Sequence, residues 1–160
     1  MAHRINSKCT GCSACARQCP TRAISGALHQ RYRVDANLCI DCGVCGMICD
    51  DLAVEDELGC LAPRVPRGDR LRPVIEPAMC NGCGICIAYC PFACLELEGA
   101  LNAGVAILTE PLACVSCREC VEICMKGAIA MRPLDLERFD PADDRARART
   151  LLDDYLEVGE

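Results

Sequence analysis

The sequence has few large side chains from which to build a hydrophobic core. Its 160 residues include no tryptophan, two phenylalanines and three tyrosines. Apolar burial alone would leave such a chain only marginally stable. The hydrophobic fraction of 52% does not contradict this, because it includes 18 cysteines. We therefore expect bound metal to replace part of the missing core, and the metal-free chain to be largely unfolded.

The sequence also lacks the features of several protein classes. It has no apolar run long enough to cross a membrane, and Met1–Gln18 does not resemble a secretory signal. We expect a cytoplasmic protein without a membrane span, in a compartment that keeps thiols reduced. The net charge of −6 argues against a nucleic acid partner. No phosphate-binding loop, dinucleotide fingerprint or nucleophile–base pair is recognisable, so we expect no catalytic residues and no enzyme activity of its own.

Cysteine, by contrast, is abundant and regularly spaced. Sixteen of the 18 cysteines form the pattern Cys-x-x-Cys-x-x-Cys-x-x-x-Cys, written four times. Three thiolates at two-residue gaps can hold three corners of a [4Fe-4S] cubane, and the fourth is expected to reach a neighbouring cluster. The spacing therefore predicts four [4Fe-4S] clusters and electron transfer. The motifs are Cys9, Cys12, Cys15 and Cys19 (motif one); Cys39, Cys42, Cys45 and Cys49 (motif two); Cys80, Cys83, Cys86 and Cys90 (motif three); and Cys114, Cys117, Cys120 and Cys124 (motif four).

Zinc and disulfides are the alternative uses of so many cysteines. Zinc sites usually combine two separated Cys-x-x-Cys pairs rather than a continuous triplet followed by a fourth cysteine. A disulfide scaffold is typical of short secreted chains. The unbroken spacing in all four motifs favours iron–sulfur clusters over both.

The motifs fall into two pairs, separated by a stretch rich in proline and arginine. Such a stretch is typical of an extended linker. The sequence therefore predicts a first two-cluster module over 1–60, a linker over 61–78, a second two-cluster module over 79–132 and a tail over 133–160.

Each module resembles a bacterial two-cluster ferredoxin, over about Arg4–Ala53 and Val74–Arg132. The resemblance implies an α+β fold of tandem ferredoxin-like modules, each with short strands and two short helices. Asp50 and Met125 stand where the family pattern has a proline after the fourth cysteine, which leaves ligation unaffected. Strand-like segments near the motifs agree with the implied fold, at 32–34, 74–75, 105–108 and 128–131.

The same resemblance implies that the two motifs of a module exchange their fourth cysteines. In the alternative, each motif holds its own cluster. Cys19→Ser would distinguish the two assignments, because it would damage cluster two under the exchange and cluster one under the alternative. The exchanged sets are Cys9, Cys12, Cys15 and Cys49 (cluster one); Cys39, Cys42, Cys45 and Cys19 (cluster two); Cys80, Cys83, Cys86 and Cys124 (cluster three); and Cys114, Cys117, Cys120 and Cys90 (cluster four).

Two cysteines and two histidines lie outside the motifs. Free cysteine is commonly a small buried apolar residue, and we interpret Cys60 and Cys94 in this way. Cys94, one helical turn beyond Cys90, could instead sit against a cluster or serve as an alternative ligand. His3 and His29 have no partner at ligand spacing, and we interpret both as surface residues.

Charges beside the ligands are candidates for tuning the clusters. Asp41 precedes Cys42 in motif two, and Arg118 lies inside motif four. The hypothesis is that they bias the potentials of clusters two and four in opposite directions. In the alternative, Arg118 pairs with a neighbouring glutamate.

The tail predicts an amphipathic helix. Asp140 can cap its start and Pro141 suits its first turn. The apolar stripe could pack on the chain's own module or on a partner subunit. The residues of this stripe are Ala148, Leu151, Leu152, Tyr155 and Leu156.

The whole chain resembles the small polyferredoxin subunits of large redox enzymes. In size, uniform motifs and short tail it is similar to the ferredoxin-like small subunit of bacterial tungsten-containing aldehyde oxidoreductases. That resemblance implies a tungstopterin catalytic subunit and a flavin (FAD) subunit that reduces NAD. Hydrogenase, benzoyl-CoA reductase and heterodisulfide reductase systems contain similar subunits. A free soluble polyferredoxin and an iron–sulfur sensor or structural protein are the alternatives.

Charge is distributed unevenly along the chain. Met1–Val34 contains six Lys or Arg and no acid, whereas Asp35–Cys60 contains seven acids and no base. Cys114–Glu160 holds eleven acids against seven bases. Opposed ends predict head-to-tail self-association, which generates rings or open filaments. The alternatives are solvated faces, or a basic end that docks on an acidic catalytic subunit.

Overall fold

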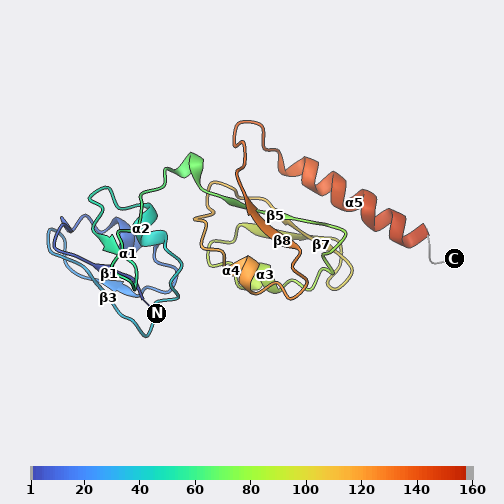
Figure 1. Cartoon of the computed structure of the whole chain (residues 1–160). Coiled ribbons are helices and arrows are strands. Elements are labelled where there is room, and N and C mark those ends of the chain that lie inside the picture. The colour runs from blue at the N-terminus through green and yellow to red at the C-terminus, as the bar shows by residue number, and fades with distance from the viewer. Residues whose placement is uncertain (1, 158–160) are drawn as a thin grey trace. The chain divides into compact units, whose positions relative to one another are not determined.

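A computed structural model describes the backbone of residues 2–157 and the side chains as far as Leu152 (Figure 1). The chain divides into a first unit, Met1–Asp69, and a second unit, Arg70–Glu160. Both contain short helices and short strands, so the predicted mixed helix and strand content is confirmed. None of the helices in the described part is long and apolar enough to span a bilayer.

The first unit is built from two small antiparallel ladders and two short helices. Strand β1 pairs with β4, and β2 pairs with β3. The ladders are only two residues long, which explains why the sequence pattern signalled just one of the four strands. In chain order the elements are β1 (Arg4–Ile5), α1 (Ala14–Gln18), β2 (Ile24–Ser25), β3 (Arg33–Val34), α2 (Val44–Met47), β4 (Val54–Glu55) and the 3-10 helix η1 (Arg67–Asp69).

The second unit repeats this order with longer strands and adds a C-terminal helix. Strand β5 pairs antiparallel with β8, and β6 pairs antiparallel with β7. Strand β5 lies within the range 61–78 that the sequence predicts to be a linker, so this part of the range is folded into the second unit. The elements are β5 (Arg72–Ile75), α3 (Ile85–Ala88), β6 (Leu95–Glu98), β7 (Val105–Leu108), α4 (Glu119–Glu122), β8 (Ile129–Arg132) and α5 (Pro141–Glu157).

The core of each unit consists largely of cysteines and aliphatic side chains. In the first unit, Ile5, Ile24, Tyr32 and Val54 pack with cysteines of motifs one and two. In the second unit, Leu95, Leu108 and Ile129 pack with cysteines of motifs three and four. The missing aromatic mass is therefore replaced by the cysteine-bearing loops themselves.

The predicted C-terminal helix is confirmed, and it packs on the second unit. Asp140 caps it, because its Oδ1 accepts a hydrogen bond from the backbone N–H of Ala142 at 2.9 Å. Ala148 is 0% exposed, and with Leu152 it packs against Val105 and Ile107 of β7. Arg145 and Arg149 of α5 form ion pairs with Glu98 of β6.

Of the apolar stripe of α5, Ala148 and Leu152 therefore pack on strand β7 of their own unit. Tyr155 and Leu156 of the predicted stripe lie outside the described side chains.

Candidate metal centres

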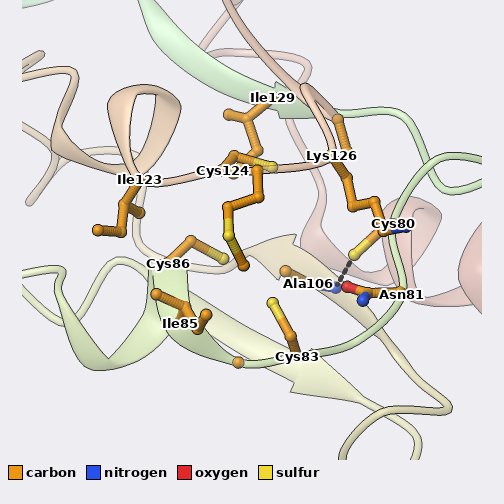
Figure 2. Close-up of a pocket in the computed structure, with 13 residues that line it drawn as sticks. Cys80, Asn81, Cys83, Ile85, Cys86, Ala106, Ile123, Cys124, Lys126 and Ile129 are labelled. Atoms are coloured by element: carbon orange, nitrogen blue, oxygen red, sulfur yellow. Dashed lines mark hydrogen bonds between the residues drawn. The ribbon is translucent and has the colours of Figure 1, made fainter.

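One pocket of the second unit brings together cysteines from motifs three and four (Figure 2). Cys80, Cys83 and Cys86 come from the loop before α3 and from α3 itself, and Cys124 follows α4. The walls between them are apolar, formed by residues that include Ile85, Ile123, Ile129 and Ala106. Burial, reinforced by the charges of Cys80, Cys83 and Cys124, raises the pKa of the Cys86 thiol to about 11.

A second pocket of this unit combines the two motifs in the opposite way. It is lined by Cys114, Cys117 and Cys120 of motif four and by Cys90 of motif three. Burial, followed by the charges of Cys117, Cys114 and Cys90, raises the pKa of Cys120 to about 12. Each pocket of the second unit thus takes three cysteines from one motif and the fourth from the other.

The first unit contains the corresponding groupings. Cys39, Cys42 and Cys45 of motif two line one pocket with Cys19 of motif one. Burial raises the pKa of Cys42, and the charges of Cys19 and Cys39 add to this effect.

Cys9 and Cys12 of motif one and Cys49 of motif two lie close enough to Cys15 for their charges to act on it. Burial and the charges of Cys9, Cys12 and Cys49 raise the pKa of the Cys15 thiol to about 11. Pocket linings thus give three groups of four motif cysteines, and the charges that act on Cys15 indicate the fourth.

The donor set fits iron–sulfur clusters. Within each group, the thiols are close enough for one thiolate to raise the pKa of another, so four thiolates need positive charge among them. Iron ions bonded to the thiolates would supply that charge and displace the thiol protons. Among the described residues, no three His, Cys, Asp or Glu side chains are placed to hold a single metal ion. The thiols instead line the walls of pockets.

A repeated backbone turn precedes each short helix. Ser13, Gly43, Gly84 and Arg118 stand immediately before α1, α2, α3 and α4, with φ of 63°, 74°, 72° and 67°. Each lies between the second and third cysteines of its motif. The left-handed residue turns the loop into the helix that carries the third cysteine, and so positions the thiols.

Backbone amides reach several ligand sulfurs. The N–H of Ala23 donates to Cys19 Sγ at 3.3 Å, and the N–H of Ala53 donates to Cys49 Sγ at 3.3 Å. The N–H of Cys94 donates to Cys90 Sγ at 3.4 Å. Such donors stabilise a thiolate and tune the potential of a cluster bonded to it.

These donors could not be predicted from the sequence. Each donor directly follows a residue with positive φ that lies three positions after the fourth cysteine of its motif. These residues are Arg22 (56°), Leu52 (49°) and Ala93 (48°). Because none of them is glycine, the sequence pattern gave no hint of the turn.

His3 is not the surface residue that its sequence context suggested. It is 9% exposed and lines the pocket of Cys39, Cys42, Cys45 and Cys19. Its Nδ1 lies 2.7 Å from Asp41 Oδ1, and neither atom has another hydrogen-bond partner among the described residues. The two side chains are thus paired beside Cys42.

The two cysteines outside the motifs differ from each other. Cys94 is 2% exposed and lines the pocket of Cys90, Cys114, Cys117 and Cys120. A hydrogen bond from its side chain is the main cause that lowers the pKa of Cys90 to about 5 and of Cys114 to about 6.

Cys60 is exposed, so the interpretation of this residue as a buried apolar side chain is wrong. Its backbone N–H donates to Asp56 Oδ1 at 2.8 Å, which places it in a surface turn after β4.

The two positions that depart from the proline pattern face outward. Asp50 forms an ion pair with Arg64. Met125 is 87% exposed, although it also contributes to the pocket of Cys80, Cys83, Cys86 and Cys124. Neither substitution changes which cysteines face the pockets.

Comparison with known proteins identifies cluster-binding segments in both units. Residues 2–25 match a family described as a 4Fe-4S binding domain, and residues 77–93 and 111–127 match a second family with the same description. The chain is 40% identical over 62 residues to Ferredoxin-2 of Chlorobaculum tepidum, which covers 39% of this chain and 84% of that ferredoxin.

Two further relatives are matched over smaller shares of their length. The ferredoxin-type protein NapF of Escherichia coli K12 is 28% identical over 101 residues, covering 58% of this chain and 57% of NapF. A putative formate dehydrogenase of Staphylococcus aureus is 38% identical over 84 residues, covering 50% of this chain but only 8% of that protein. The ferredoxin-like segment is therefore a small part of the last relative.

Proposed function

The chain belongs to the ferredoxin family of 4Fe-4S proteins, and we propose that it carries four [4Fe-4S] clusters as the electron-transfer subunit of an oxidoreductase complex. Ferredoxin-like electron transfer follows from the family. When bound, a cluster of this type supplies one-electron chemistry. The number of clusters, their ligands and the complex are the further steps of the proposal.

The grouping of the cysteines is the single observation that carries the proposal. We assign clusters one to four to the exchanged ligand sets, because Cys124 lines a pocket with motif three, Cys90 with motif four, and Cys19 with motif two. The gathering of Cys9, Cys12 and Cys49 around Cys15 supports the fourth set.

The residues of this chain have three tasks in that role. The loops hold thiols at the corners of each cluster, the apolar walls exclude water, and backbone amides such as that of Ala53 donate to ligand sulfurs. The division of the structure into the units Met1–Asp69 and Arg70–Glu160 supports two two-cluster modules, the second of which starts before β5 rather than at residue 79 and includes α5.

We infer that the partner is a large catalytic redox subunit. The match to a short part of a putative formate dehydrogenase supports this, because there a ferredoxin-like segment belongs to a redox enzyme. The resemblance to small subunits of tungsten-containing aldehyde oxidoreductases makes a tungstopterin subunit the first candidate, with an FAD subunit that reduces NAD as the electron acceptor. The cysteine content suits a reducing, cytoplasmic compartment.

A free electron carrier is the second candidate, because one observation favours it. The match to Ferredoxin-2 covers 84% of a protein that bears the name of ferredoxin alone. Purification of the native protein under anaerobic conditions separates the two. A stoichiometric large subunit supports the complex, whereas a monomer that accepts and returns electrons in solution supports the carrier.

The same purified protein tests the clusters themselves. Iron and acid-labile sulfide content should correspond to four [4Fe-4S] clusters per chain, and electron paramagnetic resonance (EPR) of the reduced protein should show interacting cubanes. Zinc without sulfide, or only two clusters, would contradict the proposal.

Self-association is part of the proposal as a property of the basic N-terminal segment. Its six basic residues, Arg4, Lys8, Arg17, Arg22, Arg31 and Arg33, are all exposed. The acids at the end of the chain, from Asp153 to Glu160, lie outside the described side chains. Oligomers that shrink as salt rises, and that disappear when Arg4, Lys8 and Arg17 are changed to Glu, would support head-to-tail contact. A constant size at every salt and protein concentration would refute it.

A further inference from the structure

A buried arginine lies close to the pocket assigned to cluster four. Arg72, at the start of β5, is 0% exposed. Its Nε donates to the carbonyl oxygen of Pro111 at 2.6 Å, and its Nη1 donates to the carbonyl oxygen of Arg70 at 2.7 Å. A buried guanidinium remains charged and needs such acceptors, since its desolvation is costly. The chain therefore maintains a positive charge inside the second unit.

One hydrogen bond ties this charge to the segment before motif four, and the next residue of the strand lines the pocket. Pro111 belongs to the segment that leads directly into Cys114. Pro73, the neighbour of Arg72 on β5, lines the pocket of Cys90, Cys114, Cys117 and Cys120.

The first unit has the same ladder but different charges. The pair Ile5–Val54 of the first unit corresponds to the pair Ile75–Ile129 of the second unit. Arg72 lies three residues before Ile75, so its counterpart in the first unit is Ala2. Beside the second cysteine of the motif the first unit has Asp41, whereas the second unit has Ser116. Beside the pocket of cluster two there is therefore a partly exposed acid paired with His3, whereas the charge near the pocket of cluster four is a buried arginine.

We propose that Arg72 raises the reduction potential of cluster four and makes it easier to reduce than cluster two. Reduction adds one electron, taken from an external reductant such as dithionite, and hence one negative charge. A fixed positive charge nearby stabilises the reduced state, and burial limits its screening by solvent and salt. No proton is exchanged with Arg72, because a guanidinium stays protonated.

This assignment differs from the expectation that Arg118 has this role. Arg118 lines the pocket of cluster four but is exposed, so water and salt screen its charge, whereas Arg72 is enclosed. The inference rests on the proposed function, since it requires cluster four to be present.

The test is a redox titration of the intact holoprotein, followed by EPR. Arg72→Gln removes the charge but keeps an N–H donor for Pro111, and Arg72→Lys keeps the charge. Arg132→Gln is the matched control, because Arg132 faces Arg72 in the β5–β8 ladder but is exposed. The signal of cluster four is identified as the one that Cys117→Ala removes.

In Arg72→Gln the potential of cluster four should become more negative, with the same shift at neutral and alkaline pH and at low and high salt. Arg72→Lys should retain most of the original potential, and Arg132→Gln should leave it unchanged. A full set of clusters with an unchanged potential in Arg72→Gln would overturn the inference. Equal shifts in the Gln and Lys variants would also overturn it, because they would indicate altered packing. Absence of cluster four from the wild-type protein would instead refute the proposed function.

Discussion

Gly82→Ala should release the clusters of the second unit far faster than a comparable change elsewhere in that unit. Gly82 has φ of +64°, and a Cβ built there would lie 2.4 Å from the carbonyl oxygen and 2.5 Å from the nitrogen of Gly104. The backbone N–H of Asn102 donates to the carbonyl oxygen of Gly82 at 2.8 Å, so the two segments are held together. Both clashing atoms belong to the backbone, which cannot rotate away.

The magnitude follows from a matched control. Gly127 has φ of +61°, and no atom lies within 4 Å of a Cβ added there. Gly127→Ala therefore carries only the conformational cost of a left-handed alanine, about 1 kcal/mol. Gly82→Ala adds an overpacking cost of about 1–3 kcal/mol. If cluster loss proceeds through opening of this loop, these costs correspond to about 5-fold and at least about 30-fold faster loss.

The rates can be compared through the decay of visible cluster absorbance in moderate denaturant, under anaerobic conditions. Circular dichroism before denaturant addition should confirm that both variants are folded and loaded. Equal decay rates for Gly82→Ala and Gly127→Ala would refute the close approach of this loop to Gly104.

Three further predictions concern the ligands, the helix and the metal. Cys19→Ser should free the cysteine thiols within 39–45 rather than those within 9–15, because the exchanged assignment places Cys19 on cluster two. Alkylation followed by mass spectrometry would locate the freed thiols. Labelling within 9–15 instead would contradict the exchange. Ala148→Glu should detach α5, because it introduces a carboxylate at a 0% exposed position at a cost of a few kcal/mol; trypsin should then cleave the helix quickly, whereas the exposed control Ala146→Glu should resist. Removal of iron with a chelator should unfold both units, since metal binding and folding are coupled; circular dichroism that stays unchanged would show that the small apolar cores are sufficient.

The features that could be predicted from sequence are those with a local cause. Regular cysteine spacing predicts which thiols belong to one loop, and the Asp140–Pro141 start predicted α5 because capping depends on adjacent residues. The packing of α5 on its own unit stayed open, because an apolar stripe does not reveal which surface covers it.

The features that could not be predicted depend on contacts between distant segments. Arg72 lies in a stretch of proline and arginine typical of a linker, yet pairing with β8 encloses it. His3 has no ligand partner nearby in sequence, but folding places it against Asp41. Leu52 and Ala93 adopt positive φ without being glycine, so the turns that direct amides toward ligand sulfurs left no trace in composition.

The exchange of fourth cysteines is the central claim about how this chain holds its clusters. A crystal structure of the anaerobically purified protein, with iron located by anomalous scattering, tests it most directly. We expect four cubanes per chain, with Cys124 bonded to the cluster of Cys80, Cys83 and Cys86, and Cys90 bonded to the cluster of motif four. A cubane bonded to all four cysteines of a single motif, or a chain with fewer than four cubanes, would contradict it.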